Sequence, residues 1–170
     1  LLNGVTKGHT SMTGTFFGSC GLAECITKTA KQAGWKRKYG KLPPLKGIGI
    51  GIGAMASGAK GVFKHDTSAA FIKIVDDGSM SLFVGLPDMG QSSHTAMAMI
   101  AAEVLGAKPT DITVISGDTD IVPLDVGALI QRGTFNTGNA VKAAALDARK
   151  QLEVLAAGRL GVKPAQLAGT

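Results

Sequence analysis

Residues 90–95 (GQSSHT) gather small and hydrogen-bonding side chains where the chain enters a predicted helix. A helix N-terminus exposes free backbone N–H groups and the positive end of the helix dipole, and both attract anions. Gly90 lets a ligand approach the backbone, Gln91 offers a donor and an acceptor, and Ser92 and Ser93 offer hydroxyls. These groups could cradle a polar, phosphate-bearing ligand. Taken alone, however, they are explained more simply by helix capping through Ser92 or Ser93.

The loop over residues 117–135 is a second candidate site, because loops this long inside a compact domain tend to be functional. Its three aspartates, Asp118, Asp120 and Asp125, lack the alternation and the terminal Glu of a calcium loop. We therefore expect them to accept backbone hydrogen bonds in turns. His94 is expected to be a packed or surface histidine. We predict no metal ligand and no catalytic residue in the chain.

A second helix start follows this loop. Gln131, Arg132 and Thr134 stand at or just before a helix that the apolar spacing predicts over about residues 136–157. Its polar N-terminus could face the same ligand as residues 90–95. Two such termini around one ligand would form a coherent binding site.

The elements that must position these residues follow from the apolar periodicity. Helices are predicted over about 19–33, 92–105 and 136–157, and strands over about 68–75, 80–86 and 111–116. A turn at residues 76–79 joins the first two strands as a hairpin. This order favours an α+β fold with helices packed on a mixed β-sheet.

Residues 47–54 (GIGIGIGA) alternate strictly, which predicts one more strand with a bare glycine face. A valine at Gly51 should then clash. The run also resembles a dinucleotide fingerprint at 51–56 and a phosphate loop at 53–61. Both motifs need a helix directly afterwards, and residues 57–61 (SGAKG) should break one, so nucleotide binding is disfavoured.

Composition limits the remaining classes. The 170 residues carry a net charge of +6, with Lys and Arg clustered in residues 31–46. That cluster is either a solvated basic loop or a contact for an anionic cofactor tail. No membrane span or signal peptide is predicted, so we expect a cytoplasmic protein without a nucleic-acid partner. The chain opens without Met, and we expect residues 1–170 to be a single domain segment, incomplete at both ends.

The chain resembles a known enzyme family in four stretches. Residues 87–127 (PDMGQSSHTAMAMIAAEVLGAKPTDITVISGDTDIVPLDVG) and 132–141 (RGTFNTGNAV) look like the molybdenum-cofactor-binding region of the xanthine dehydrogenase / aldehyde oxidase family. Residues 19–38 and 46–61 also resemble that subunit. Within this family, the chain most resembles the 4-hydroxybenzoyl-CoA reductase-like branch.

The resemblance implies a cofactor site for molybdopterin bearing molybdenum, often as the cytosine dinucleotide. Gln91 matches the family's cofactor-contacting glutamine, and Gly90, Ser92 and Ser93 match its neighbours. Ala128, Leu129, Ile130, Gln131 and Gly133 match the loop that holds the pterin. Because the branch usually has a Ser-Ser pair where this chain has Ile130 and Gln131, backbone N–H groups are the contacts implied here.

The resemblance also implies partners. The rest of the molybdenum subunit, with its catalytic glutamate, and iron–sulfur and FAD-binding subunits or segments would complete the enzyme. The implied activity is hydroxylation of a small-molecule aldehyde or N-heterocycle, or reductive dehydroxylation of an aromatic CoA thioester. This chain alone should be inactive. The alternative is a non-catalytic binding or assembly module of the same fold.

Overall fold

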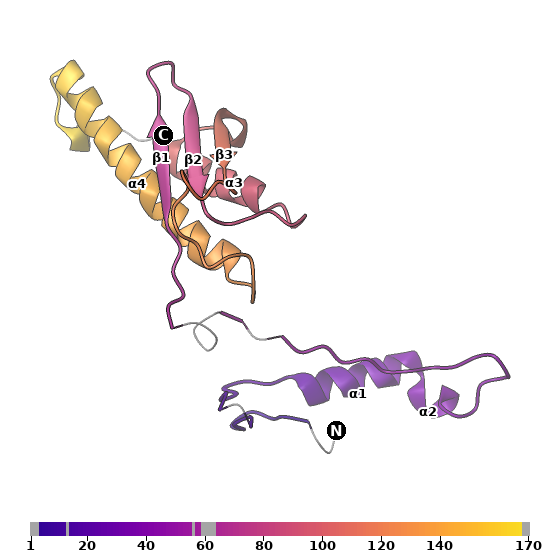
Figure 1. Ribbon diagram of the computed structural model, residues 1–170. Helices are drawn as coiled ribbons and strands as arrows, with labels where there is room; N and C mark the ends of the chain where they lie inside the picture. The colour runs from indigo at the N-terminus through magenta and orange to yellow at the C-terminus, as the bar shows by residue number, and fades with distance from the viewer. Residues whose placement is uncertain (1–3, 13, 56, 59–63, 168–170) are drawn as a thin grey trace. The chain divides into compact units, whose positions relative to one another are not determined.

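The computed structural model describes residues 4–12, 14–55, 57–58 and 64–167 of the chain. The chain divides into two compact units, Leu1–Ala54 and Met55–Thr170, each described by itself below. Both candidate stretches, residues 90–95 and 128–133, lie in the second unit (Figure 1).

The first unit is built around helix α1, Leu22–Ala33, and the short helix α2, Trp35–Lys38. Gly34 ends α1 as predicted, since its φ of 69° suits a residue without a Cβ. The predicted start at Ser19 was early, because the N-cap is Gly21. The basic run expected as a loop contains α2, and Lys36 and Arg37 are exposed on it. The two interpretations of this basic cluster stay open.

The strand predicted over residues 47–54 is wrong. Residues 47–54 adopt no regular secondary structure, and Ile50 and Ile52 are 45% and 61% exposed. An extended segment becomes a strand only when a neighbour takes its backbone hydrogen bonds. Within the described part of the chain no strand pairs with it. A Cβ added at Gly51 meets no atom within 4 Å, so the expected clash of a valine there is also wrong.

Several residues of the disfavoured nucleotide motifs, Ala56 and residues 59–61, lie outside the described part of the chain. Residues 51–55, which begin both motifs, are not helical. The argument against nucleotide binding therefore stays a prediction.

The second unit contains a three-stranded mixed sheet in the order β1-β2-β3. Strands β1, Ala70–Ile74, and β2, Met80–Val84, form the predicted antiparallel hairpin. Strand β3, Ile112–Ile115, pairs parallel to β2. A parallel neighbour requires a crossover, and helix α3, Ser93–Leu105, with the 3-10 turn Pro109–Asp111 (η1), supplies it.

Helix α4, Gly133–Leu160, packs on α3 and along β1, while α3 contacts β3. The core between helices and sheet contains six residues that the apolar periodicity placed inward: Leu82, Val84, Leu86, Met97, Ala101 and Val141. Ala98, Ala102 and Ile112 complete it. The helices approach closely at Gly138, where an added Cβ would lie 3.0 Å from Ile100 Cδ1. The predicted α+β class, with helices packed on a mixed sheet, is confirmed.

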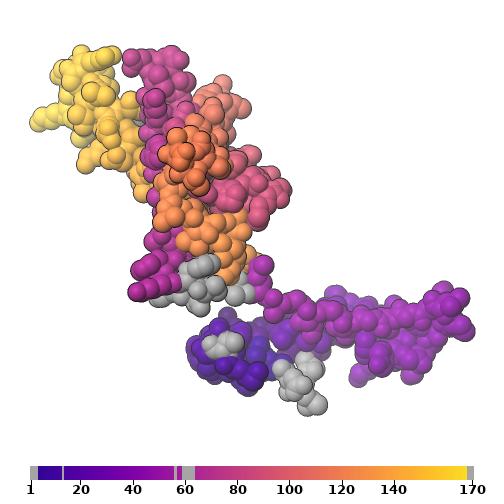
Figure 2. All heavy atoms as spheres, viewed as in Figure 1, coloured from indigo at the N-terminus to yellow at the C-terminus, as the bar shows by residue number. Residues whose placement is uncertain are grey.

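The C-terminal half of α4 forms an outer edge of the second unit (yellow in Figure 2), followed by the 3-10 turn Pro164–Gln166 (η2). Leu152 and Leu155, which belong to its predicted apolar stripe, are 44% and 66% exposed. The buried residues of this stripe, Val141 and Ala145, lie in the N-terminal half of the helix. Among the described residues, no helix combines the length and apolar character of a membrane span.

Candidate functional site

The turn between β2 and α3 is closed by its own side chains. Gln91 accepts a hydrogen bond from the Met89 N–H at Oε1 (2.6 Å) and donates from Nε2 to the Pro87 carbonyl (3.2 Å) and to Ser93 Oγ (3.3 Å). Ser93 Oγ also donates to the Pro87 carbonyl (3.2 Å). Gly90 has a φ of 103°, which favours glycine. Gln91 therefore fixes the shape of this turn from within.

The expected capping of α3 by Ser92 or Ser93 is wrong. Ser92 occupies the N-cap position, but its left-handed backbone (φ 60°) is not that of a capping residue, and it makes no side-chain cap. Asp88 serves instead, accepting the Gly90 N–H at 2.8 Å and the His94 N–H at 3.3 Å. The hydrogen bond from Gly90 outweighs desolvation and, with that from His94, holds the pKa of Asp88 below its usual value.

His94 joins the start of α3 to the ends of two strands. Its Nε2 lies 2.8 Å from Ser116 Oγ and 3.2 Å from the Leu86 carbonyl oxygen. Ser116 directly follows β3, and Leu86 is buried two residues after β2. His94 is half-buried, which agrees with the expectation of a packed or surface histidine. No cluster of three metal-binding side chains occurs among the residues described.

The second candidate loop reaches α4 through a left-handed turn. Ile130 and Gln131 have φ values of 46° and 56°, which side-chain-bearing residues adopt rarely. The Arg132 N–H donates to the Leu129 carbonyl at 3.1 Å, closing the turn. Earlier in the loop, Asp118 accepts the Asp120 N–H at 3.0 Å, the turn role expected of it.

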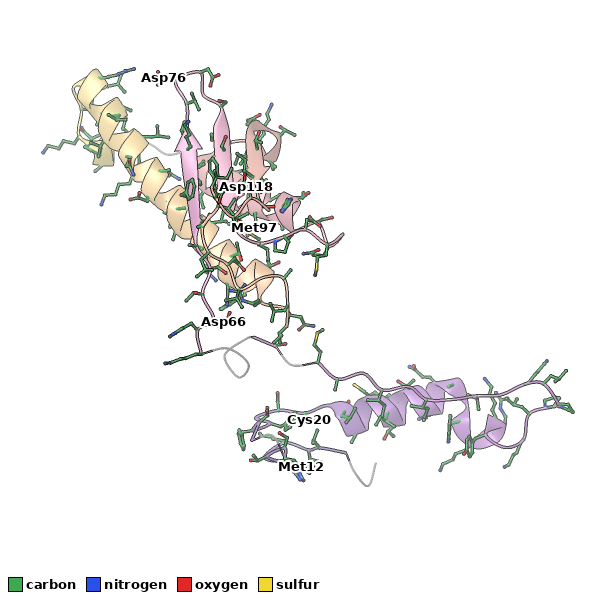
Figure 3. All side chains as sticks on the ribbon, in the orientation of Figure 1. Met12, Cys20, Asp66, Asp76, Met97 and Asp118 are labelled. Atoms are coloured by element: carbon green, nitrogen blue, oxygen red, sulfur yellow. The ribbon has the colours of Figure 1, made fainter. Side chains whose placement is uncertain are left out.

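Arg132 is buried (2% exposed) beneath this turn, and its charge is paired. Its Nε lies 2.5 Å from Asp66 Oδ1, and its Nη1 lies 2.5 Å from Asp125 Oδ1. Burial alone would raise the pKa of Asp125, but hydrogen bonds from Ser68, the Gly127 N–H, Thr137 and Arg132 outweigh it and lower that pKa. Figure 3 labels Asp66, which lies beside the start of α4 and also accepts Asn136 Nδ2 at 2.7 Å.

One cavity of about 500 Å³ brings the two candidate stretches together. This volume is in the range of small-molecule and cofactor sites. Of the predicted site residues, the following line it: Gln91, Ser93, Ala128, Leu129, Ile130, Gln131 and Gly133. Gly90 and Ser92 lie in the adjoining turn but do not line it.

Two helix N-termini meet at this cavity, as the hypothesis of a shared ligand requires. Helix α3 begins at Ser93 and α4 at Gly133. Within the described part of the chain, the backbone N–H groups of Gln91, Ile130 and Gly133 have no acceptor. Such N–H groups, together with the helix dipoles, can bind oxygen atoms of an anionic or polar ligand without a positively charged side chain.

Thr134, which the sequence placed at the second helix start, also lines the cavity. The sequence did not indicate four further lining residues: Met55, Leu86, Met89 and Ala96. All four are apolar, and nothing in an apolar residue's type separates a cavity wall from a core. The ion pair of Arg132 with Asp66 was also missed, since the two residues lie far apart in the sequence.

Comparison with known proteins gives these features a context. The family model described as "Molybdopterin cofactor-binding domain" matches residues 25–169. "Probable hypoxanthine oxidase XdhD" of Escherichia coli (strain K12) is 32% identical over 164 residues, which cover 95% of this chain and 17% of that protein. "Putative xanthine dehydrogenase molybdenum-binding subunit XdhA" of the same strain is 28% identical over 155 residues, covering 86% and 20%.

Among solved structures, a Cu,Mo-CO dehydrogenase in its carbon monoxide-reduced state matches with a TM-score of 0.62 and 28% identity. The match covers 88% of this chain and 19% of that one. The chain thus spans about a fifth or less of the length of these relatives. Since the family model covers most of its length, the chain belongs to the molybdopterin cofactor-binding domain family and corresponds to a segment of a molybdenum-binding subunit.

Proposed function

We propose that the cavity between the residue 87–93 turn and the residue 128–133 loop holds part of a molybdopterin cofactor in a molybdenum-dependent oxidoreductase. The observation that carries this proposal is the meeting of two helix N-termini, α3 and α4, at one cavity in a chain of this family. The donor set fits the group, because pterin and phosphate oxygens suit free backbone N–H groups.

In this proposal the residues of the chain bind the cofactor and orient it. The free N–H groups of Gln91, Ile130 and Gly133 would donate to the cofactor. Gly90 and Ser92 shape the turn that presents Gln91, while Ser93 and Ala128 to Gln131 form the wall. The bound group would supply the redox chemistry at molybdenum.

The described part of the chain supplies no general acid or base to the cavity. None of the described residues that line it is ionisable near neutral pH. A general base must lie within hydrogen-bonding reach of the proton it takes. We therefore propose that proton transfer relies on another segment of the protein, and that residues 1–170 alone are inactive.

The reaction class follows the relatives only in outline. Their names refer to an oxidase of hypoxanthine and to dehydrogenases of xanthine and of carbon monoxide. We propose oxidation of a small molecule, such as hydroxylation of an aldehyde or N-heterocycle, with iron–sulfur and FAD-binding partners to remove electrons. Reductive dehydroxylation of an aromatic CoA thioester stays a prediction, as do the cytosine dinucleotide form and a cytoplasmic location.

The test is cofactor content in the complete protein. Molybdenum is measured by elemental analysis, the pterin by its oxidised fluorescent product, and CMP after acid hydrolysis for the dinucleotide form. Ala96→Phe places a ring from α3 into the cavity, and Ala144→Phe places one in a separate groove between α4 and β1. We expect Ala96→Phe to lose molybdenum and pterin, while Ala144→Phe keeps both.

Two outcomes would count against the proposal. Equal cofactor content in both folded variants would show that the cofactor does not occupy this cavity. Absence of molybdenum and pterin from the complete wild-type protein would favour the non-catalytic binding or assembly module.

A further inference from the structure

We propose that Arg132 is a positioning residue that holds the residue 128–131 turn in shape at the cofactor cavity. This inference rests on the proposed function for its consequence, but not for its geometry. Arg132 does not line the cavity, and all of its donors are used elsewhere, so it is not a direct ligand for the cofactor.

The guanidinium of Arg132 has five N–H donors, and the structure gives it five acceptors. Nε donates to Asp66 Oδ1 (2.5 Å), and Nη1 donates to Asp125 Oδ1 (2.5 Å) and the Gly127 carbonyl (3.0 Å). Nη2 donates to the Thr67 carbonyl and to Ser68 Oγ, both at 2.7 Å. This complete set is specific to arginine, because lysine has only three donors on one nitrogen.

The acceptors belong to two segments that are distant in sequence. Asp66, Thr67 and Ser68 precede β1, and Asp125 and Gly127 precede the turn. Arg132 therefore connects the turn to the segment that precedes β1. An isolated antiparallel bridge between Ser68 and Asp125 joins the same two segments.

Two side chains in the first turns of α4 donate hydrogen bonds to the carboxylates of Asp125 and Asp66 as well. Thr137 Oγ1 donates to Asp125 Oδ2 at 2.8 Å, and Asn136 Nδ2 donates to Asp66 Oδ1 at 2.7 Å. Thr137 is fully buried. Both ends of the 128–131 turn are thus fixed, at Gly127 by Arg132 and at the helix start by these two side chains.

The backbone of the 128–131 turn is unfavourable by itself and must be held by other contacts. Ile130 and Gln131 both have left-handed backbones, which cost free energy in residues that carry a Cβ. On the other side, Gly58 N–H donates to the Ile130 carbonyl and Ser57 Oγ to Gln131 Oε1, both at 2.8 Å. The Ser57–Gln131 bond is exposed and Gly58 is half-buried, whereas the side chains of Arg132 and Asp125 are fully buried. The network therefore carries most of the restraint.

The test compares Arg132→Lys and Arg132→Met with Arg149→Met in the complete protein. Arg149 is a matched control: it lies on α4, pairs with Glu153 at 2.9 Å and reaches the Val104 carbonyl at 3.2 Å. Seventeen residues of helix separate it from Arg132, about 25 Å. Hydrogen exchange is followed in cofactor-free protein over residues 126–133, with α3 and β2 as reference, and molybdenum content is measured in parallel.

We expect exchange over residues 126–133 to accelerate about tenfold in both Arg132 variants, equivalent to about 1.4 kcal/mol of local protection. In the Arg132 variants, α3 and β2 should exchange at the wild-type rate. In Arg149→Met, residues 126–133 should also exchange at the wild-type rate. Failure of lysine to restore the rate would show that the donor geometry, not the charge, is what matters. Molybdenum content should fall in the Arg132 variants only.

Unchanged exchange over residues 126–133 in a folded Arg132→Met protein would overturn the proposal. Acceleration spread equally over α3 and β2 would also overturn it, because that pattern indicates general destabilisation. Accelerated local exchange with normal molybdenum content would keep the positioning role and reject the proposed cofactor site. If neither Arg132 variant folds, Asp66→Ala, which leaves the Asp125 pair intact, should give a smaller local acceleration, and its absence would decide against the role.

Discussion

Gly85 lies so close to Pro123 that a Cβ on the glycine would collide with the proline carbonyl oxygen and stand 2.7 Å from Asp125 Cβ. This contact lets the loop that carries Asp125 lie against the end of β2. We expect Gly85→Ala to displace residues 123–125 and to destabilise the second unit by about 1–3 kcal/mol. Thermal or urea unfolding measures the loss. A variant as stable as wild type would mean that the loop yields without cost.

Gly51→Val is expected to be nearly neutral, although Gly51 also belongs to a run of closely spaced glycines. A Cβ there meets no atom within 4 Å. The free energy of unfolding should change by less than about 0.5 kcal/mol. This substitution is therefore the control for Gly85→Ala. A large loss would reveal a neighbour on the glycine face of residues 47–53 that the described part of the chain does not provide.

Gln91 can be tested by separating its two functions, the closing of the turn and the lining of the cavity. Gln91→Ala removes all three side-chain bonds, to Met89, Pro87 and Ser93, whereas Gln91→Glu keeps the acceptor for Met89 and loses the donor for Pro87 and Ser93. Each lost neutral hydrogen bond should cost about 1 kcal/mol. Both variants should lower molybdenum content in the complete protein.

The control for Gln91 is Gln151→Ala, which removes an exposed amide bonded to Asp147 on α4. It should leave cofactor content unchanged. If the Gln91 variants also retain full molybdenum and pterin, Gln91 is only a structural residue of the turn.

Asp125 should give the second unit a dependence on acid pH. Its pKa is lowered in the folded state, so its stabilisation is complete above the unfolded value, about 3.9, and is lost as the pH falls through the folded pKa. Asp125→Asn should destabilise at pH 7 by about 3 kcal/mol, since Arg132 loses a buried partner. The gap to wild type should narrow below about pH 4.

Urea unfolding between pH 7 and pH 3 measures this effect, with Asp118→Asn as the control for loss of an exposed carboxylate. The assignment would be refuted if the stability difference between Asp125→Asn and wild type were the same at every pH.

The sequence predicted the second unit well because apolar residues at strand or helix spacing there do lie in the core. Alternation placed Leu82 and Val84 inward, and helical spacing placed Met97 and Val141 in the same core. Residues 47–54 show the limit of this reasoning. Their alternation is as regular, but a strand also needs a partner, which periodicity does not reveal.

The site was predictable only in its parts. That residues 90–95 and the start of α4 could face one ligand followed from helix N-termini, and the structure brings Gln91 and Gly133 to one cavity. The left-handed backbone of Ser92, which rules out its capping role, depends on the turn closed by Gln91. The partner of Arg132, Asp66, is joined to it only by tertiary folding, and no local pattern marks such a pair.

His94 offers a last test of how the cavity turn is held. Its Nε2 contacts both Ser116 Oγ and the Leu86 carbonyl, so His94→Ala leaves two partly buried polar groups without this partner. That should cost about 1–3 kcal/mol. Ser116→Ala leaves the contact with Leu86 and should cost less. His65→Ala, which removes an exposed histidine, serves as the control and should change little. Because His94 anchors the start of α3, its loss should also loosen residues 87–93 and reduce molybdenum content in the complete protein. Unfolding free energies that decrease from wild type to Ser116→Ala to His94→Ala would support the role of His94 as an anchor of α3. A His94→Ala protein as stable as His65→Ala would exclude that role.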